Sequence, residues 1–436
     1  MPVQVRETPS QAAARTERAQ RGKPAHWVHD KPNEFINPWP SFRQAINGVG
    51  DGLKVRASMR CMPCSALTVL AQMLRTGLSI SRNPPSKDDV GQIGSQKPDW
   101  GRLEAGARDG QITATWLGHA CFLVELPVAG TAAKRGPRIL FDPVFSDRCS
   151  PSQWIGPKRY TPPPCAIEEI PEVDAIVISH NHYDHMDTTT LKTLLSRPSA
   201  PHVFAPLGDG NTEYFASLGI PASRAHCLDW WDARRVSVST SSKDTDPDVE
   251  FDVTFTPGQH FTGRGLRDRF KTLWGGWVVE GASASESESQ SPGEKTPPTP
   301  KVYFAGDTGY RAVYSDTDDG PEDLPVCPAF KEIGERWGGF DLALIPIGAY
   351  APRTYMSPVH CAPRDSVAIF KDIKARRGLG MHWGGGCSAW VLTTEHVLEP
   401  PKKLAEECAK AGVKEGVFGV CDIGETVEVG VAGDDV

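Results

Sequence analysis

The chain has 436 residues and a formal net charge of -7 at pH 7, with a pI near 6.0. This length allows a sizeable hydrophobic core in one domain or two. The acidic balance, without a dense stripe of lysine and arginine, argues against a nucleic-acid partner.

The 11 cysteines are scattered and odd in number. This usage differs from the disulfide framework of a small secreted domain and indicates a reducing compartment. No apolar run is long enough to span a bilayer, and the N-terminus lacks a secretory signal. We therefore expect an intracellular protein that is soluble or attached to a membrane at its surface.

Residues 1–34 are predicted to form a disordered tail on compositional grounds. Their first 23 residues combine arginines with serine, threonine and alanine, which faintly resembles an organelle transit peptide and leaves a mitochondrial location as an alternative. Residues 35–110 are predicted to form an N-terminal extension. Within it, residues 65–80 place leucines at helical spacing beside a few arginines. That amphipathic helix either lies in a membrane interface or packs its apolar face on the domain.

Hydrophobic periodicity becomes regular near residue 111, so we predict a catalytic domain over 111–430. The predicted strands, in chain order, are 111–117, 120–126, 138–142, 175–179, 203–205, 251–256, 274–279, 302–305 and 342–347. The predicted helices are 187–197, 211–218, 364–376 and 401–411. This mixture indicates an α/β fold in which helices cover the sheets. Two segments, at about 282–300 and 311–328, interrupt the pattern and are predicted to be surface insertions, the first of them disordered.

The predicted strand at 175–179 runs directly into His180-Asn-His182-Tyr-Asp184-His185. Three imidazoles and a carboxylate within six residues are suited to zinc, which binds both groups readily. Further candidate ligands follow later strands at His260, Asp307 and His382. We assign His180, His182 and His260 to one cation and Asp184, His185 and His382 to a second, with Asp307 bridging them.

These ligand sets leave coordination positions open for water, as a catalytic site requires. Two cations about 3.5–4 Å apart lower the pKa of a water molecule and clamp the oxygens of a phosphoester. Hydrolysis is therefore the predicted chemistry, with Asp184, Asp307 and His360 as catalytic residues. His360 precedes a predicted helix; it either contacts the substrate or leaving group, or it caps that helix or packs against the domain.

Other candidates carry weaker signals. His119 either orients a loop or acts directly, and Asp142 and Asp187 are either partners of ligand imidazoles or turn residues. The lone Cys61-Met-Pro-Cys64 is predicted to hold free thiols. A tryptophan-rich context favours a hydrophobic ligand and includes Trp230, Trp231 and Trp274.

Several longer strings surround these residues: Asn37-Pro-Trp-Pro40, Thr115-Trp-Leu-Gly-His-Ala120, Gly156-Pro-Lys-Arg159, Phe304-Ala-Gly-Asp-Thr-Gly-Tyr310 and Met381-His-Trp-Gly384. Together they resemble the metallo-β-lactamase superfamily and, within it, the N-acyl phosphatidylethanolamine-hydrolysing phospholipase D family, over residues 35–42 and 111–425. The resemblance implies a metallo-β-lactamase αβ/βα sandwich, with two mixed β-sheets flanked by helices.

The resemblance also implies two zinc ions and cleavage of N-acyl phosphatidylethanolamine to phosphatidic acid and an N-acylethanolamine. It carries the metal-ligand roles onto the seven residues assigned above, and an additional active-site histidine onto His360. It further implies a membrane phospholipid substrate, peripheral membrane contact and a homodimer. The chain departs from the family after His360, where Cys361-Ala-Pro-Arg-Asp-Ser366 replaces a carboxylate-rich sequence, and at both insertions.

Two other functions remain open. A metallo-hydrolase of another superfamily branch, such as a lactonase or nuclease, would use the same metal core, since a fold does not determine a function. A non-catalytic membrane scaffold would require lost ligands, and none is missing.

Overall fold

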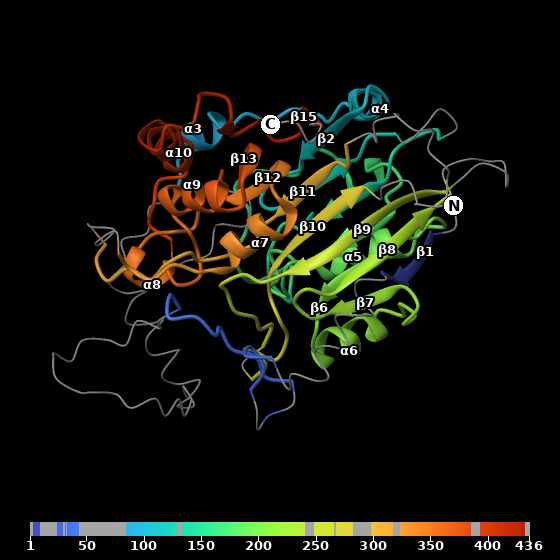
Figure 1. The fold of residues 1–436 in the computed structure, drawn as a ribbon, viewed down its shortest axis with the longest axis horizontal. Helices are drawn as coiled ribbons and strands as arrows, with labels where there is room; N and C mark the ends of the chain where they lie inside the picture. Colours follow the sequence, from blue (N-terminus) through green and yellow to red (C-terminus); the bar gives the residue numbers. More distant parts are fainter. Residues whose placement is uncertain are drawn as a thin grey trace.

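The computed structural model describes residues 3–8, 24–28, 31, 33–42, 84–128, 133–239, 248–265, 267–281, 298–316, 323–384 and 393–431. Its described strands form two sheets that lie face to face, with helices on the outer sides (Figure 1). The architecture is therefore the α/β sandwich of two mixed sheets that the sequence predicts.

One sheet has eight strands in the order β1-β8-β9-β10-β11-β12-β13-β14. Their bounds are β1 Val3–Glu7, β8 Ala233–Val238, β9 Val249–Thr256, β10 Gly276–Gly281, β11 Lys301–Phe304, β12 Phe340–Pro346, β13 Ala375–Met381 and β14 Phe418–Gly419. The strands from β1 to β11 pair antiparallel, and those from β11 to β14 pair parallel. The carboxyl ends of the parallel strands consequently meet at one edge of the sheet.

The other sheet has seven strands in the order β15-β2-β3-β4-β5-β6-β7. Their bounds are β15 Thr426–Gly430, β2 Gln111–Trp116, β3 Phe122–Glu125, β4 Arg138–Phe141, β5 Ala175–Val177, β6 His202–Pro206 and β7 Ala225–Leu228. Pairing is parallel from β4 to β7 and antiparallel elsewhere. Strand β5 ends just before the histidine motif, which places that motif at a sheet edge.

Each sheet has its own covering helices. On the seven-stranded sheet these are α4 (Trp100–Arg108), α5 (Thr188–Leu195) and α6 (Asp209–Ser217); on the eight-stranded sheet they are α7 (Ala329–Trp337), α9 (Pro363–Asp372) and α10 (Glu399–Lys410). Two short helices, α3 (Lys87–Gly91) and α8 (Arg353–Met356), and a 3-10 turn (Ile167–Glu169) lie in connections. Each of the six covering helices buries apolar residues, for example Leu191 and Leu194 of α5.

The main core lies between the two sheets. Aromatic side chains from opposite sheets meet there, with ring centroids 4.8 Å apart for Phe141 and Phe304 and 6.4 Å apart for Phe204 and Trp277. A second apolar cluster, which includes Leu103, Leu140 and Phe215, lies beneath the helices of the seven-stranded sheet. Full burial of such side chains contributes roughly 1.5–3 kcal/mol each, so the sheets form a rigid base for the loops at their edge.

The structure corrects two boundaries. Val3–Glu7, expected in a disordered tail, instead forms the edge strand β1 and pairs with β8. Leu103 of α4 is fully buried, so the packed domain begins before residue 111. The sequence patterns of β1 and α4 were weak because an edge strand and a short helix are stabilised mainly by packing against the sheet.

The expected insertions are only partly described. Residues 282–297 lie outside the described part of the chain, as do the predicted helix at 65–80 and Cys61 and Cys64. In the second insertion, Val313 and Cys327 are buried, so its two ends belong to the core and the expectation of a purely surface segment is wrong there. In the part of the chain that the structure describes, no helix is both long and apolar enough to cross a bilayer.

Seven described cysteines are free thiols. Cys149 is disulfide-bonded.

Candidate metal centre

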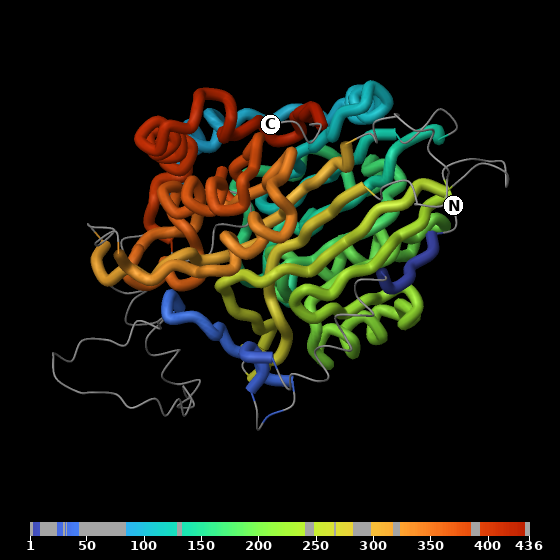
Figure 2. Tube along the Cα trace, in the orientation of Figure 1, coloured from blue at the N-terminus to red at the C-terminus, as the bar shows by residue number. Residues whose placement is uncertain are grey.

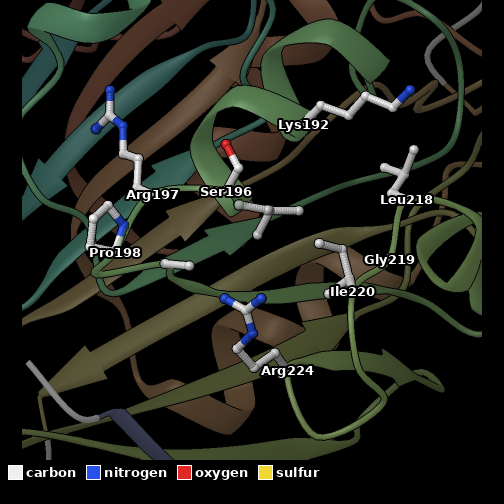
Figure 3. Close-up of a pocket in the computed structure, with 10 residues that line it drawn as sticks. Lys192, Ser196, Arg197, Pro198, Leu218, Gly219, Ile220 and Arg224 are labelled. Atoms are coloured by element: carbon white, nitrogen blue, oxygen red, sulfur yellow. The ribbon is translucent and has the colours of Figure 1, made fainter.

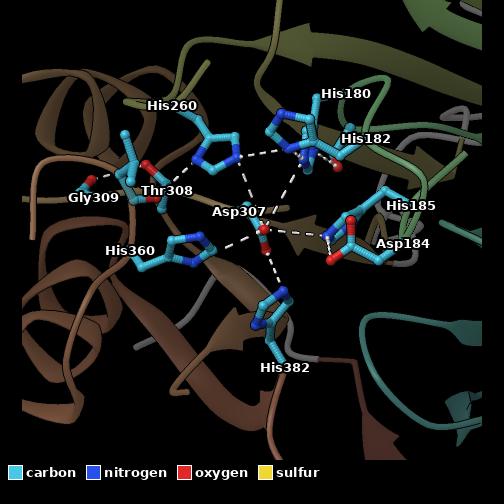
Figure 4. Close-up of polar contacts among 12 residues, drawn as sticks. His180, His182, Asp184, His185, His260, Asp307, Thr308, Gly309, His360 and His382 are labelled. Carbon is cyan, nitrogen blue, oxygen red and sulfur yellow. Dashed lines mark hydrogen bonds and ion pairs between the residues drawn. The ribbon is translucent and has the colours of Figure 1, made fainter. Parts of the chain in front are cut away.

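The candidate ligands converge on one edge of the sandwich from loops that follow different strands (Figure 4). The histidine motif follows β5, His260 follows β9, Asp307 follows β11 and His382 follows β13. The tight turn after β11 depends on Gly306, which has a φ of 60° and where a Cβ would lie only 2.4 Å from Ser179 Cβ. A glycine is therefore needed for the β11 loop to approach the β5 loop.

Asp307 lies at the centre of the cluster. Its Oδ2 is 3.1 Å from His185 Nε2, and its Oδ1 is 3.1 Å from His382 Nε2. The same carboxylate is 3.9 Å from His260 Nε2 and 4.0 Å from His180 Nε2. One carboxylate thus faces imidazoles of both expected ligand sets, which is the position required of a bridging ligand.

Among the described residues, the ligand atoms form four overlapping groups, each close enough to surround one cation. Two of them are His180, His182 and His260, and His119, Asp184, His185 and His382; the other two join Asp142 with His180 and His185, and Asp307 with His260 and His360. The Nε2 atom of His180 is 2.8 Å from His182 Nδ1, and His260 Nε2 is 3.4 Å from the same atom. The structure therefore brings the seven sequence-predicted residues together in one cluster.

The ligand imidazoles are held by contacts on their far sides. His185 Nδ1 is 2.7 Å from Asp142 Oδ2, and His260 Nδ1 donates to the Val359 carbonyl at 2.8 Å. Such contacts fix the tautomer and direct the other nitrogen towards the centre. Val359 was not foreseen, because a backbone carbonyl leaves no signal in residue type.

Burial is the largest influence on most of these imidazoles. It lowers the pKa of His182 to about 4 and the pKa of His260 and His119 to about 3. These groups are consequently neutral near pH 7, which is the form that binds a metal cation.

For His185 and Asp307, the charges of neighbouring side chains outweigh the effect of burial on the pKa. Burial opposes protonation of His185, but the carboxylates of Asp307, Asp184 and Asp142 raise its pKa well above the ordinary value. Burial likewise opposes ionisation of Asp307, but His185, His382 and His360 hold its pKa well below the usual range. The centre therefore holds ionised carboxylates that attract positive charge.

The hydrogen bonding of the donor set fits a bound cation. Several buried polar atoms meet no neighbour in hydrogen-bond geometry among the described residues: His185 Nε2, Asp307 Oδ1, and both ring nitrogens of His119 and of His382. Three of these nitrogens nevertheless lie 3.1–3.3 Å from a carboxylate oxygen. Burying polar atoms without partners is costly. Imidazole nitrogens and carboxylate oxygens converging in this way satisfy the ligand preferences of zinc and similar divalent cations.

The structure resolves the open sequence alternatives for three residues. Asp142 contacts the ligand His185, whereas Asp187 caps α5 by accepting from Thr189 N at 3.2 Å. His119, with a φ of 53°, places Nε2 3.3 Å from Asp184 Oδ2 and so belongs to the centre itself. Its sequence signal was a histidine that follows Gly118 in the turn after the buried strand β2.

His360 lies beside the centre, with Nδ1 3.9 Å from Asp307 Oδ2, and its pKa is lowered to about 3, chiefly by burial.

Trp230 and Trp274 are buried, and each indole donates to a backbone carbonyl. Their interpretation as evidence for a hydrophobic ligand is therefore wrong: they form part of the core.

The N-terminal segment also supports the centre. Residues 33–42, blue in Figure 2, run along the loop that carries His260. Asn37 Nδ2 donates to the His260 carbonyl at 2.8 Å, and Ser41 Oγ donates to Gln259 Oε1 at 2.6 Å. The role of Asn37 could not be assigned from sequence, because its partner lies more than two hundred residues along the chain.

A separate surface hollow lies at the ends of α5 and α6 (Figure 3). Its lining includes Lys192, Arg197 and Arg224, with Leu218 and Ile220, and contains no histidine, cysteine or carboxylate. Of these two sites, only the cluster at the strand ends therefore has side chains that could bind a metal cation.

Comparison with known proteins agrees with this geometry. The family model of the β-lactamase superfamily domain matches residues 137–383, more than half of the chain. An N-acyl-phosphatidylethanolamine-hydrolyzing phospholipase D 1 of Caenorhabditis elegans is 35% identical over 73% of this chain and 76% of that protein. A mitochondrial phospholipase D of the same name from Saccharomyces cerevisiae is 32% identical over 70% of this chain, which spans 53% of the yeast protein.

Among solved structures, a metallo hydrolase of Ignicoccus hospitalis aligns with a TM-score of 0.42 and 18% identity, over 73% of this chain and 98% of that one. The family match and the converging His and Asp ligands indicate a metal-dependent hydrolase. The chain belongs to the N-acyl-phosphatidylethanolamine-hydrolysing phospholipase D family of the metallo-β-lactamase superfamily.

Proposed function

We propose that this protein is a phosphodiesterase of phospholipase D type that holds two zinc ions and hydrolyses N-acyl phosphatidylethanolamine to phosphatidic acid and an N-acylethanolamine. The observation that carries the proposal is the position of Asp307, whose carboxylate lies within 4.0 Å of imidazoles of both proposed ligand sets. A single structural zinc would need four ligands and no shared carboxylate.

The first cation would be held by His180, His182 and His260, the second by Asp184, His185 and His382, with Asp307 shared. His119 is an additional candidate ligand in the second group. When bound, the two cations supply an activated water and neutralise charge on the oxygens of the phosphodiester.

The surrounding side chains orient this chemistry. Asp142 keeps the Nδ1 proton of His185 directed away from the centre, and the Val359 carbonyl does the same for His260. His360 lies at the edge of the cluster as a neutral imidazole. In this proposal its ring N–H donates a hydrogen bond to a phosphoryl or leaving-group oxygen of the substrate.

The substrate assignment is supported by the names of the nematode and yeast relatives. It implies that the enzyme works at the surface of an intracellular membrane, where its lipid is located. A homodimer is part of the same proposal, by likeness to the family.

The test measures metal content and lipid hydrolysis on the same preparations of wild type, His182→Ala and His396→Ala. The wild type should hold about two zinc ions per chain and release N-acylethanolamine from mixed micelles. His182→Ala should lose metal and retain less than about 1% of the activity, because the first cation then has only two histidines besides the shared Asp307.

His396 serves as the matched control, because it is partly exposed and pairs with Asp89 rather than with the centre. His396→Ala should behave as wild type. A metal-loaded wild type that leaves the phospholipid intact but cleaves a lactone or a nucleic acid would reject the substrate assignment and retain the metal centre.

A further inference from the structure

The loop after β4 carries the most exposed large hydrophobic side chains among the described residues. Trp154 is 91% exposed and its neighbour Ile155 is 76% exposed, with Tyr160 also on the surface. Placing two adjacent apolar side chains in water is unfavourable by roughly 25 cal/mol per Å². A functional reason is therefore needed for their position.

The base of this loop is ordered by many hydrogen bonds. Cys149 N donates to the Pro157 carbonyl at 3.1 Å, and Arg159 N donates to the Asp147 carbonyl at 3.0 Å. Gln153 exchanges two hydrogen bonds with the backbone of Arg148. Two strand-like arms consequently hold Trp154 and Ile155 at a tip.

A tight turn closes the tip. Gly156 has a φ of 112°, and a Cβ at this position would lie 2.6 Å from Ser150 Cβ. Because only glycine fits here without strain, the outward position of the tip is built into the backbone.

Both arms are attached to the metal centre. Phe145 N and Ser146 N donate to the carboxylate of Asp187, two residues beyond the ligand His185. On the other arm, Thr161 Oγ1 donates to the Gly384 carbonyl, two residues beyond the ligand His382. The exposed tip is therefore fixed relative to the loops that carry two ligands of the second group.

The size and charge of the tip favour a lipid surface over a second protein chain. A tryptophan supplies roughly 150–250 Å² of contact area, whereas a standard protein interface needs about 800 Å² on each partner. Lys158, 59% exposed at its side chain and 3.8 Å from the exposed Asp147 carboxylate, places a cation close to the two apolar residues in the sequence. Tryptophan with a nearby lysine is the combination found at membrane–water interfaces.

We propose that Trp154 and Ile155 insert into the interface of a phospholipid bilayer and hold the metal centre against it. This inference rests on the proposed lipid function for its purpose, but insertion itself requires no hydrolysis. The loop would then bring the phosphodiester of a membrane lipid to the ligand loops to which its arms are bonded.

The test uses the full-length protein and vesicles of phosphatidylcholine and phosphatidylglycerol that contain no N-acylated lipid. Co-sedimentation should show at least about tenfold weaker partitioning for Trp154→Ser/Ile155→Ser than for wild type. Tyr314→Ser removes another exposed aromatic side chain, 59% exposed in the wild type, and should bind within about twofold of wild type.

A second variant, Trp154→Phe, reports on how deeply the Trp154 side chain inserts into the bilayer. Trp154→Phe should still bind, because phenylalanine retains an apolar ring, but should lose the part of the fluorescence quenching by brominated lipid that Trp154 contributes. Equal binding by wild type and the double variant, or equal quenching of wild type and Trp154→Phe, would overturn the inference.

Two further outcomes separate this inference from its alternatives. If the wild type sediments as a dimer without lipid and the double variant as a monomer, the tip is a protein interface and lipid insertion is rejected. If the tip binds vesicles but the wild type does not hydrolyse N-acyl phosphatidylethanolamine, the proposed substrate fails and the docking surface stands.

Discussion

Replacing Asp142 with asparagine is a direct test of how the structure supports its metal centre. Asp142 is fully buried and accepts from His185 Nδ1 at 2.7 Å, from Ser179 N at 2.7 Å and from Ser179 Oγ at 2.5 Å. Its φ is 38°, a conformation that asparagine also tolerates. The substitution therefore changes the hydrogen bonding with little expected change in the backbone.

An asparagine has one accepting oxygen in place of two. If its amide nitrogen faces Ser179 N, two donors oppose each other; if it faces His185 Nδ1, the imidazole must shift its proton to Nε2, the nitrogen that faces the centre. Losing such a partner typically weakens metal affinity by about 10–100-fold. This corresponds to about 1.4–2.7 kcal/mol of binding free energy.

The assay is a chelator competition that measures zinc affinity, together with unfolding of the metal-free proteins. Asp187→Asn is the matched control, because Asp187 is also buried but caps α5 rather than touching a ligand. Asparagine is an equally good N-cap, and the other donors to Asp187, which include Phe145 N and Ser146 N, belong to no proposed ligand. This variant should therefore keep its zinc affinity within about twofold. Equal affinities for the two variants would refute the assigned role of Asp142.

Three further predictions concern metal, backbone space and pH. Removing the metal with a chelator should lower the thermal unfolding midpoint by several degrees, because a cation present at about 1,000 times its Kd adds about 4 kcal/mol to the free energy of unfolding. An unchanged midpoint in calorimetry would argue against a tightly held metal. Gly348→Ala should reduce zinc affinity about tenfold or more, because the alanine Cβ would lie 2.2 Å from the His382 carbonyl oxygen. The same chelator competition measures this change, and full affinity would show that the loop adapts. Burial is the main reason why the pKa of His226 falls from 6.5 to about 4 in the folded protein, and the charges of His202 and Arg234 lower it further. The unfolded chain therefore binds a proton at His226 more readily than the folded chain does. Stability should therefore fall as the pH drops from about 6.5 to 4, by up to roughly 3 kcal/mol from this group. Urea unfolding of metal-loaded His226→Phe should show a smaller loss over that window than wild type, and an equal loss would reject the assignment.

The metal centre was largely predictable because its signals are local. Four ligands lie within six residues after an apolar strand, and His260, Asp307 and His382 each follow a further predicted strand. In an α/β sandwich, strand ends gather at one edge, so residues distant in the chain could be grouped in advance. The long strings around the ligands indicated the family in addition.

Other features depended on contacts that no local pattern encodes. Strand β8 contains Arg234 and Arg235, and it forms because β1 and β9 pair with it on both sides. The sequence also left Asp142 and Asp187 equivalent, although both are buried carboxylates with quite different partners.

The sequence by itself therefore predicted which histidines and carboxylates gather at the strand ends and how strands and helices alternate. Tertiary structure alone decided that His119 joins the second group, that Asp142 orients His185, and that Trp154 is exposed while Trp274 is buried. The physical reason is that periodicity reports which face of an element is apolar. The partner that a side chain meets is set by how the two sheets and their connecting loops pack together.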